Sequence, residues 1–164
     1  MGRVSTLPEP RHRVSEQAVR MWRMTAWLST AVSLIVIAGL YLFLPWWSWW
    51  AWVIAALVLI ADVAYALLSP CLRYRVHRWE VTDEAVYART GWLNVEVAIA
   101  PLSRVQTVDV EQGAIMRLYG LASVTVTTAS SAGSISIDGL DAATAREVVA
   151  HLTTVTAASE GDAT

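Results

Sequence analysis

The sequence of 164 residues contains no lysine and only one cysteine, Cys71. A single thiol excludes an internal disulfide and a metal site built from several cysteines, and it fits a cytosolic environment for the soluble part of the chain. The H-E-x-x-H, P-loop, G-x-S-x-G and dinucleotide-binding patterns are also missing. Three histidines, His12, His77 and His151, are far apart in sequence, and only the fold decides whether His77 and His151 face each other. These absences predict a protein that is not an enzyme and that holds no cofactor or metal.

Charge is absent from the long segment between Arg23 and Asp62, where nearly every residue is apolar. A hydrocarbon core takes about 20 apolar residues per helix, so this segment predicts membrane-spanning helices at residues 24–44 and 49–68. The tryptophan-rich turn that follows Pro45 is uncharged, whereas arginines flank the pair of helices on both sides. Arginine-rich flanks stay in the cytoplasm. We therefore expect a multi-pass protein of the cell (inner) membrane with both the N and C termini cytoplasmic.

Composition divides the chain into four parts. Residues 1–14 contain proline and charge and predict a disordered cytoplasmic tail. Residues 15–69 combine an interfacial lead-in with the transmembrane hairpin, and Pro70 is expected to end the second helix because proline disfavours helical geometry at the preceding residue. Residues 70–157 predict a folded domain, and residues 158–164 predict a second disordered tail.

Beyond Pro70 the pattern changes from continuously apolar to alternating, which is typical of strands with one buried face. Six or seven short strands are expected between about residues 72 and 137. The segment from Asp141 to about Thr156 predicts a helix capped by Asp141. Its apolar stripe consists of Ala145, Val148, Val149, Leu152 and Val155. Antiparallel strands followed by an amphipathic helix predict a small sandwich or open barrel with the helix at one end.

Two motifs resemble the YdbS-like family of bacterial membrane proteins. They are Pro-Leu-Ser-Arg-Val-Gln at residues 101–106 and Arg-Leu-Tyr-Gly-Leu-Ala at residues 117–122. The resemblance covers about residues 15–155. It implies an α+β membrane protein, in which a two-helix transmembrane hairpin is followed by a pleckstrin-homology-like antiparallel β-sandwich or barrel with a C-terminal helix. One departure lies at Ser130 and Ser131, where the family usually has glycine after Thr-Ala.

The resemblance implies no reaction and instead a membrane-associated scaffold or partner-binding protein. Family members are sometimes paired with a larger relative that repeats the same domain, so the expected partners are another membrane protein of this kind and membrane lipids. An alternative is a lipid- or small-ligand-binding module at the cytoplasmic membrane face. From Trp79 to Val155 the chain carries four basic and nine acidic residues. This balance disfavours binding to anionic lipid and to nucleic acid.

Four polar residues of the domain are candidate contacts for a partner or ligand. They are Arg104, Gln106, Gln112 and Arg117. Arg104 and Gln106 lie two apart on an expected strand and would point to one face, and with the other two they form a candidate patch for a peptide or lipid headgroup. The alternative is structural, because such side chains in a small barrel often satisfy a loop carbonyl or an edge strand.

Asp62 is a candidate intramembrane contact. It lies within the second apolar segment, about 9 Å from the cytoplasmic end at 1.5 Å per residue. A carboxylate in a membrane helix is costly unless it is paired or hydrated. Ser29 and Ser33 are four apart in the first apolar segment and would share one helix face at similar depth, where they are expected to hydrogen-bond Asp62. We interpret Asp62 as a mark of helix–helix contact, within the hairpin or with a partner; the alternative is that it reaches the interface or is protonated.

Overall fold

The structure, a computed structural model, describes most of the chain. The described residues are 10–43, 48–129 and 133–161. They form two units, a helical hairpin of residues 19–72 and a β-rich domain that combines residues 1–18 with residues 73–164. The departure at Ser130 and Ser131 and the proline and tryptophans at 45–47 lie outside the described residues.

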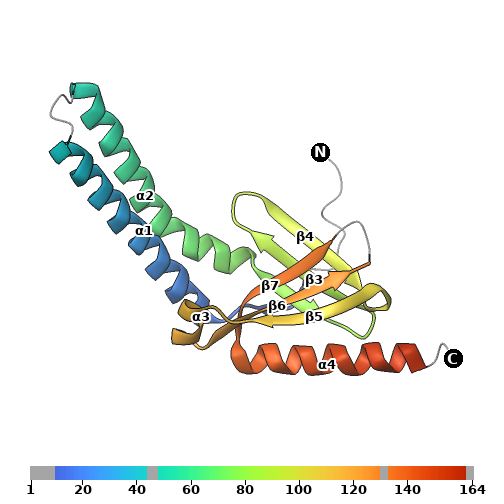
Figure 1. Ribbon diagram of the computed structural model, residues 1–164. Coiled ribbons are helices and arrows are strands. Elements are labelled where there is room, and N and C mark those ends of the chain that lie inside the picture. Colours follow the sequence, from blue (N-terminus) through green and yellow to red (C-terminus); the bar gives the residue numbers. More distant parts are fainter. Residues whose placement is uncertain (1–9, 44–47, 130–132, 162–164) are drawn as a thin grey trace, which may run out of the picture. The chain divides into compact units, whose positions relative to one another are not determined.

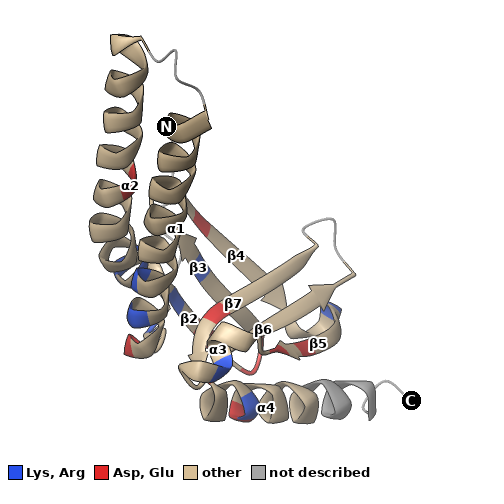
Figure 2. Cartoon of the chain, turned by 60° about the vertical axis from the view of Figure 1, so that its left-hand side comes forward, with Lys and Arg blue, Asp and Glu red and all other residues tan. Residues whose placement is uncertain are grey.

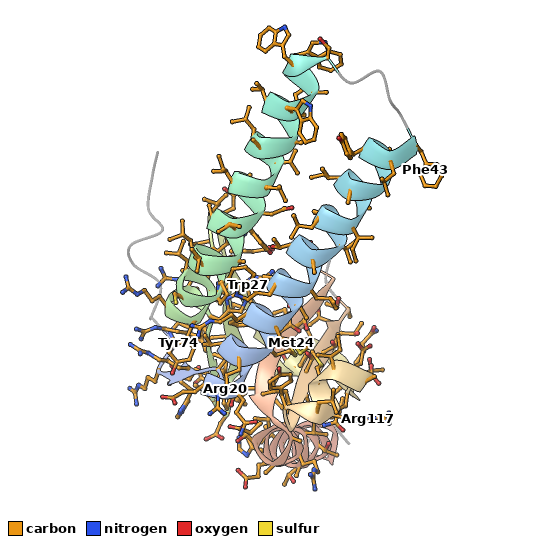
Figure 3. All side chains as sticks on the ribbon, turned by 90° about the vertical axis from the view of Figure 1, so that its left-hand side faces the viewer. Arg20, Met24, Trp27, Phe43, Tyr74 and Arg117 are labelled. Atoms are coloured by element: carbon orange, nitrogen blue, oxygen red, sulfur yellow. The ribbon has the colours of Figure 1, made fainter. Side chains whose placement is uncertain are left out.

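The helical hairpin is formed by α1 (Glu16–Phe43) and α2 (Trp49–Val76), which run side by side (Figure 1). Each helix has 28 residues, which corresponds to about 42 Å and exceeds a hydrocarbon core of about 30 Å. In each, the most apolar stretch has a mean hydropathy of 2.0 or more, and 11% of it is buried. Phe43 ends α1 with its side chain pointing outward (Figure 3). Apolar helices with such exposed side chains fit contact with lipid rather than with water.

Pro70 does not end the second helix, contrary to the prediction from sequence. It lies inside α2, which continues to Val76. Proline removes one backbone hydrogen bond and crowds the carbonyl four residues earlier, here that of Ala66. Membrane helices tolerate this where the surrounding structure satisfies the freed group, and Ala66, Ser69 and Pro70 are all buried. The domain therefore begins near Arg73 rather than at residue 70.

Two antiparallel sheets make up the domain. The first has the order β1-β2-β3-β4 and the second has the order β5-β6-β7. The strands of the first sheet are β1 (His12–Arg13), β2 (Arg78–Val81), β3 (Ala85–Gly91) and β4 (Val95–Pro101). Those of the second are β5 (Val105–Glu111), β6 (Leu121–Thr128) and β7 (Ser134–Asp141). The short helices η1 (Leu102–Arg104) and α3 (Ala114–Leu118) flank β5, and α4 (Ala142–Gly161) follows β7. Two antiparallel sheets and a C-terminal helix confirm the predicted α+β, pleckstrin-homology-like fold.

The core lies between the sheets and is closed by α4. Strands of both sheets contribute fully buried side chains, among them Val86 of β3 and Val124 of β6. The predicted stripe of α4 is confirmed, because Ala145 and Leu152 are 0% exposed and the remaining stripe residues also pack on the core. The helix continues to Gly161 instead of ending near residue 156, so the predicted tail is helical over residues 158–161.

The predicted disordered tail is wrong for residues 10–14, because β1 pairs with β2. His12 lies opposite Trp79 and Arg13 opposite Arg78, and Trp79 Nε1 donates to the Arg13 carbonyl at 3.3 Å. Ser15 continues the attachment through its backbone N–H, which donates to the β7 carbonyl of residue 139 at 2.9 Å. The hairpin is therefore inserted between the first and second strands of the domain and is joined to it at both ends.

Ser15 and Asp141 connect the start of α1 to the end of β7. The Ser15 hydroxyl donates to Asp141 Oδ1 at 2.8 Å and accepts from the Gln17 backbone N–H at 3.2 Å. Accepting that bond satisfies one of the free donors in the first turn of α1, as an N-cap does. Asp141, predicted as the cap of the last helix, is the final residue of β7 and accepts the bond from Ser15.

Candidate functional site

The structure separates the four candidate contact residues of the domain into two pairs. Arg104 ends η1 instead of lying on a strand, and Gln106 is the second residue of β5; both are exposed. Gln112 and Arg117 lie beyond the other end of β5. Seven residues of a strand span about 23 Å. The four side chains therefore do not form one patch.

Gln112 is bound to the fold. Its side-chain Nε2 donates to the Leu121 carbonyl at 2.8 Å, and the side chain is half-buried. Because β6 begins at Leu121, this bond closes the connection between β5 and β6 around α3. The contact is of the structural kind that the sequence left open as an alternative, in which a glutamine satisfies a loop carbonyl.

Arg117 lies on a short helix that exposes apolar side chains. Leu118 is 81% exposed and Ile115, three residues earlier on the same helix face, is 37% exposed. The next pair, Met116 and Tyr119, is half-buried. Met116 packs toward the second sheet, with its sulfur 4.0 Å from the hydroxyl of Ser123 in β6. The exposed residues Ile115, Arg117 and Leu118 are called the α3 patch; Arg117 is labelled in Figure 3.

Asp62 lies on the packed face of α2. The buried residues Ala55, Ala66 and Ser69 are spaced seven residues before it and four and seven residues after it, which places all four on one side of the helix. The Oδ2 atom of Asp62 is buried and has no hydrogen-bond partner among the described residues. An unpaired carboxylate oxygen in this position is costly, at about 3 kcal/mol for an acidic residue at the centre of a membrane helix.

The two serines predicted to meet Asp62 differ in position. Ser29 is exposed on α1, whereas Ser33 is half-buried. The buried hydroxyl at this depth belongs to Thr30, which is 4% exposed and donates to the Ala26 carbonyl at 3.2 Å. Thr30 and Asp62 are equally far from the outer ends of α1 and α2. Sequence reasoning missed Thr30, although its four-residue spacing from the small residue Ala26 indicates the packed face.

His77 and His151 have different contacts, and the third histidine, His12, lies in β1. His77 joins α2 to β2, is 6% exposed, and places Nδ1 2.9 Å from the Arg73 carbonyl. His151 is exposed on α4, with Nε2 3.7 Å from Asp83 Oδ1. Burial lowers the pKa of His77 below its ordinary value; the carbonyl bond and the charge of Asp138 oppose that shift, and the charge of Arg73 adds to it. Within the described part of the chain, no three His, Cys, Asp or Glu residues are grouped to hold a metal.

The lowered pKa of His77 predicts that the domain loses stability in mild acid. The unfolded chain takes up a proton near pH 6.5 while folded His77 stays neutral, so stability is complete above that pH and falls as the pH drops below it. The midpoint of thermal unfolding of the full chain in detergent is measured between pH 8 and 5.5. It should fall less steeply with decreasing pH in His77→Gln than in the wild type. His151→Gln is the control, because His151 is exposed. Equal slopes in wild type and His77→Gln would contradict the assignment.

Three arginines lie side by side on the first sheet. Arg13 is directly opposite Arg78, and Arg78 is directly opposite Arg89. Directly opposed residues of neighbouring strands point to the same face. Ala88, which precedes Arg89, is 2% exposed and belongs to the core, so Arg89 and its row point to the outer face. This arginine row was missed from the sequence because Arg13 was assigned to a disordered tail.

Two apolar helices long enough to cross a membrane, joined to two sheets and a closing helix, define a membrane protein with a pleckstrin-homology-like domain. The chain belongs to the family described as Bacterial PH domain, whose model matches residues 19–155. It is 29% identical over 154 residues to the UPF0699 transmembrane protein YdbS of Bacillus subtilis (strain 168). That match covers 90% of this chain and 96% of the relative. These matches confirm the YdbS-like resemblance and the membrane location. No solved structure gives a significant match.

Proposed function

We propose that this protein is a non-catalytic scaffold or partner-binding subunit of a membrane complex. The observation that carries the proposal is the α3 patch, an exposed apolar surface on the domain outside the membrane-spanning stretches. The family match supports a pleckstrin-homology-like domain in a transmembrane protein. The arginine-rich flanks of the hairpin favour a cytoplasmic position for both termini and hence for the domain.

The α3 patch has the composition of a small contact surface. One exposed leucine on a protein surface is ordinary, but Leu118 and Ile115 share one face of α3 and Arg117 lies between them in sequence. Arginine beside large apolar groups is enriched in protein interfaces, whereas lysine is depleted. A complementary partner would be another membrane protein that offers an apolar pocket and a carboxylate.

The patch is held in place before binding. Gln112 anchors the start of the connection to Leu121, and Met116 packs toward the second sheet. A surface that needs little ordering loses less entropy on association. Two of the residues predicted from the sequence therefore have different roles. Gln112 positions the loop, and Arg117 supplies a contact to the partner.

Purification of the tagged full-length protein in mild detergent, with mass spectrometry of what co-purifies, tests the proposal. Leu118→Ser and Arg117→Ala are expected to lower recovery of a stoichiometric membrane partner by tenfold or more, which corresponds to about 1.4 kcal/mol. Leu93→Ser is the matched control, because Leu93 is 75% exposed in the turn between β3 and β4. Unchanged recovery with Leu118→Ser, or an equal loss with Leu93→Ser, would contradict a role for the α3 patch.

The hairpin contact at Asp62 is tested in the same preparation. Asp62→Leu removes the buried carboxylate, whereas Ser29→Leu makes a comparable change on the exposed side of α1. If Asp62 joins helices in the complex, Asp62→Leu alters complex size or partner recovery and Ser29→Leu does not. Identical results for both variants would exclude a role for Asp62 in assembly.

A further inference from the structure

The arginine row places three like charges at adjacent positions. Neighbouring strands lie about 4.8 Å apart, and Arg13, Arg78 and Arg89 occupy directly opposed positions on three of them. Like charges directly opposite each other destabilise an antiparallel pair. A row of this kind is stabilised when an anion binds across it, and guanidinium groups match the geometry of phosphate oxygens with paired hydrogen bonds.

One carboxylate on this face, that of Glu80, already contacts an arginine outside the row. Glu80 lies two residues after Arg78 on β2 and so shares its face. Its carboxylate lies 3.5 Å from Arg11 Nε and accepts from the Arg11 backbone N–H at 3.3 Å. Glu80 is therefore shared with a fourth arginine from the segment before the hairpin. The outer-face positions of β1, β2 and β3 hold three arginines and one carboxylate, Glu80.

The chain ties the row to the two membrane helices. Arg78 follows the end of α2 by two residues, and Arg13 precedes the start of α1 by three. An extended chain covers at most about 3.6 Å per residue, so the row stays near the helix ends. An aromatic group suited to the headgroup region accompanies it, because the Arg13 guanidinium lies 5.8 Å from the centre of the Tyr74 ring.

The count of charged residues from Trp79 to Val155, which is acidic overall, leaves out Arg13 and Arg78. The described part of the domain contains five arginines outside residues 79–155, which are Arg11, Arg13, Arg73, Arg75 and Arg78. Glu16 and Glu160 are the carboxylates that the described part of those outer segments adds. Figure 2 shows the blue positions of β2 and β3 near each other, with red positions on β4, β5 and β7. The charge is segregated, so the domain total does not describe the field at the row.

We propose that the arginine row binds the phosphate group of an anionic phospholipid headgroup at the membrane surface. This goes beyond partner binding, because it assigns a second site on a different sheet from the α3 patch. The site is complete only when β1 is paired, since Arg13 comes from before the hairpin and Arg78 and Arg89 from after it. Lipid binding and the seating of β1 therefore support each other.

Native mass spectrometry of the full chain in detergent, with phosphatidylglycerol and phosphatidylcholine added in equal amounts, tests this site. The wild type is expected to retain phosphatidylglycerol in preference, and Arg78→Gln to lower that preference at least fivefold. Arg146→Gln makes the same charge change on an exposed residue of α4 and should leave it unaltered. Equal retention of the two lipids by the wild type, or an equal loss in Arg146→Gln, would overturn the proposal.

Competition with inorganic phosphate distinguishes a lipid headgroup from a soluble phosphate compound. Added inorganic phosphate should displace the lipid only weakly; complete displacement at millimolar phosphate would identify a soluble phosphate compound as the ligand and overturn the lipid assignment.

Thermal unfolding in lipid-free detergent tests whether Arg78→Gln still folds. Its midpoint should be unchanged or higher than that of the wild type, because one like-charge contact is removed. If Arg78→Gln does not fold, Arg13→Gln decides, since β1 pairs through its backbone; unchanged lipid preference in that variant would overturn the site. None of these variants alters the α3 patch.

Discussion

Replacement of Leu152 by alanine is expected to lower the free energy of unfolding of the domain by about 2–5 kcal/mol. Leu152 is 0% exposed and lies in the core cluster with residues of both sheets. Its loss leaves a cavity where α4 closes the sandwich, and the rigid strands around it can fill that space only in part. Because a small domain is stable by only about 5–15 kcal/mol, this change alone removes a large share.

Hydrogen exchange of the amides in β6 and β7, measured on the full chain in detergent, gives the size of this effect, because slow core amides report the opening of the whole unit. Thr154→Ala on the same helix is the control. Thr154 is exposed and its hydroxyl donates to the Ala150 carbonyl of its own helix at 2.8 Å, so a change within about 0.5 kcal/mol is expected. If Leu152→Ala cost no more than Thr154→Ala, α4 would not seal the core.

The elements that follow a strict period were predictable from the sequence. The stripe from Ala145 to Val155 repeats at helical spacing, and the alternation in β6 matches its buried residues Val124 and Val126. In each case the spacing of apolar residues within one segment is enough to identify the buried face of that segment. Two sheets and a closing helix followed from those patterns together with the family resemblance.

Features that depend on distant pairing were not predictable in the same way. A two-residue strand such as β1 is too short to show an alternating pattern in the sequence. It forms because its backbone pairs with that of Arg78 and Trp79 at the edge of β2. Pro70 is tolerated inside α2 because it is buried among other residues rather than exposed to water. Local rules on tails and prolines are sound, but tertiary packing overrides them here.

The candidate sites show the same division. Exposure of Arg117 followed from its polar character, whereas the bond from Gln112 to the Leu121 carbonyl required the fold that brings them together. The arginine row depends on the register of three strands, which places residues 65 and 11 positions apart opposite each other. A shift of one residue would turn Arg78 toward the core. Register is therefore the information that the sequence lacked at this site.

Replacement of Gly91 by alanine is expected to destabilise the first sheet by at least about 2 kcal/mol. Gly91 closes the turn between β3 and β4 with φ of +109°, a conformation that side chains rarely adopt. A Cβ atom there would collide with the Asn94 backbone oxygen and approach the Val95 Cα to 3.3 Å. Strain at such a position costs about 1–3 kcal/mol by itself, and the collision adds to it because a backbone atom cannot rotate away.

Gly113→Ala is the matched control, because Gly113 has φ of −64° and open space where a Cβ would lie. Hydrogen exchange in β3 and β4 should accelerate in Gly91→Ala and remain near the wild-type rate in Gly113→Ala. Equal protection of the β3 and β4 amides in the two variants would show that the turn accommodates alanine without loss of stability. Arg89 lies two residues before Gly91 on β3, so an opened turn also displaces one member of the arginine row. Gly91→Ala is accordingly expected to reduce retention of phosphatidylglycerol although it changes no charge.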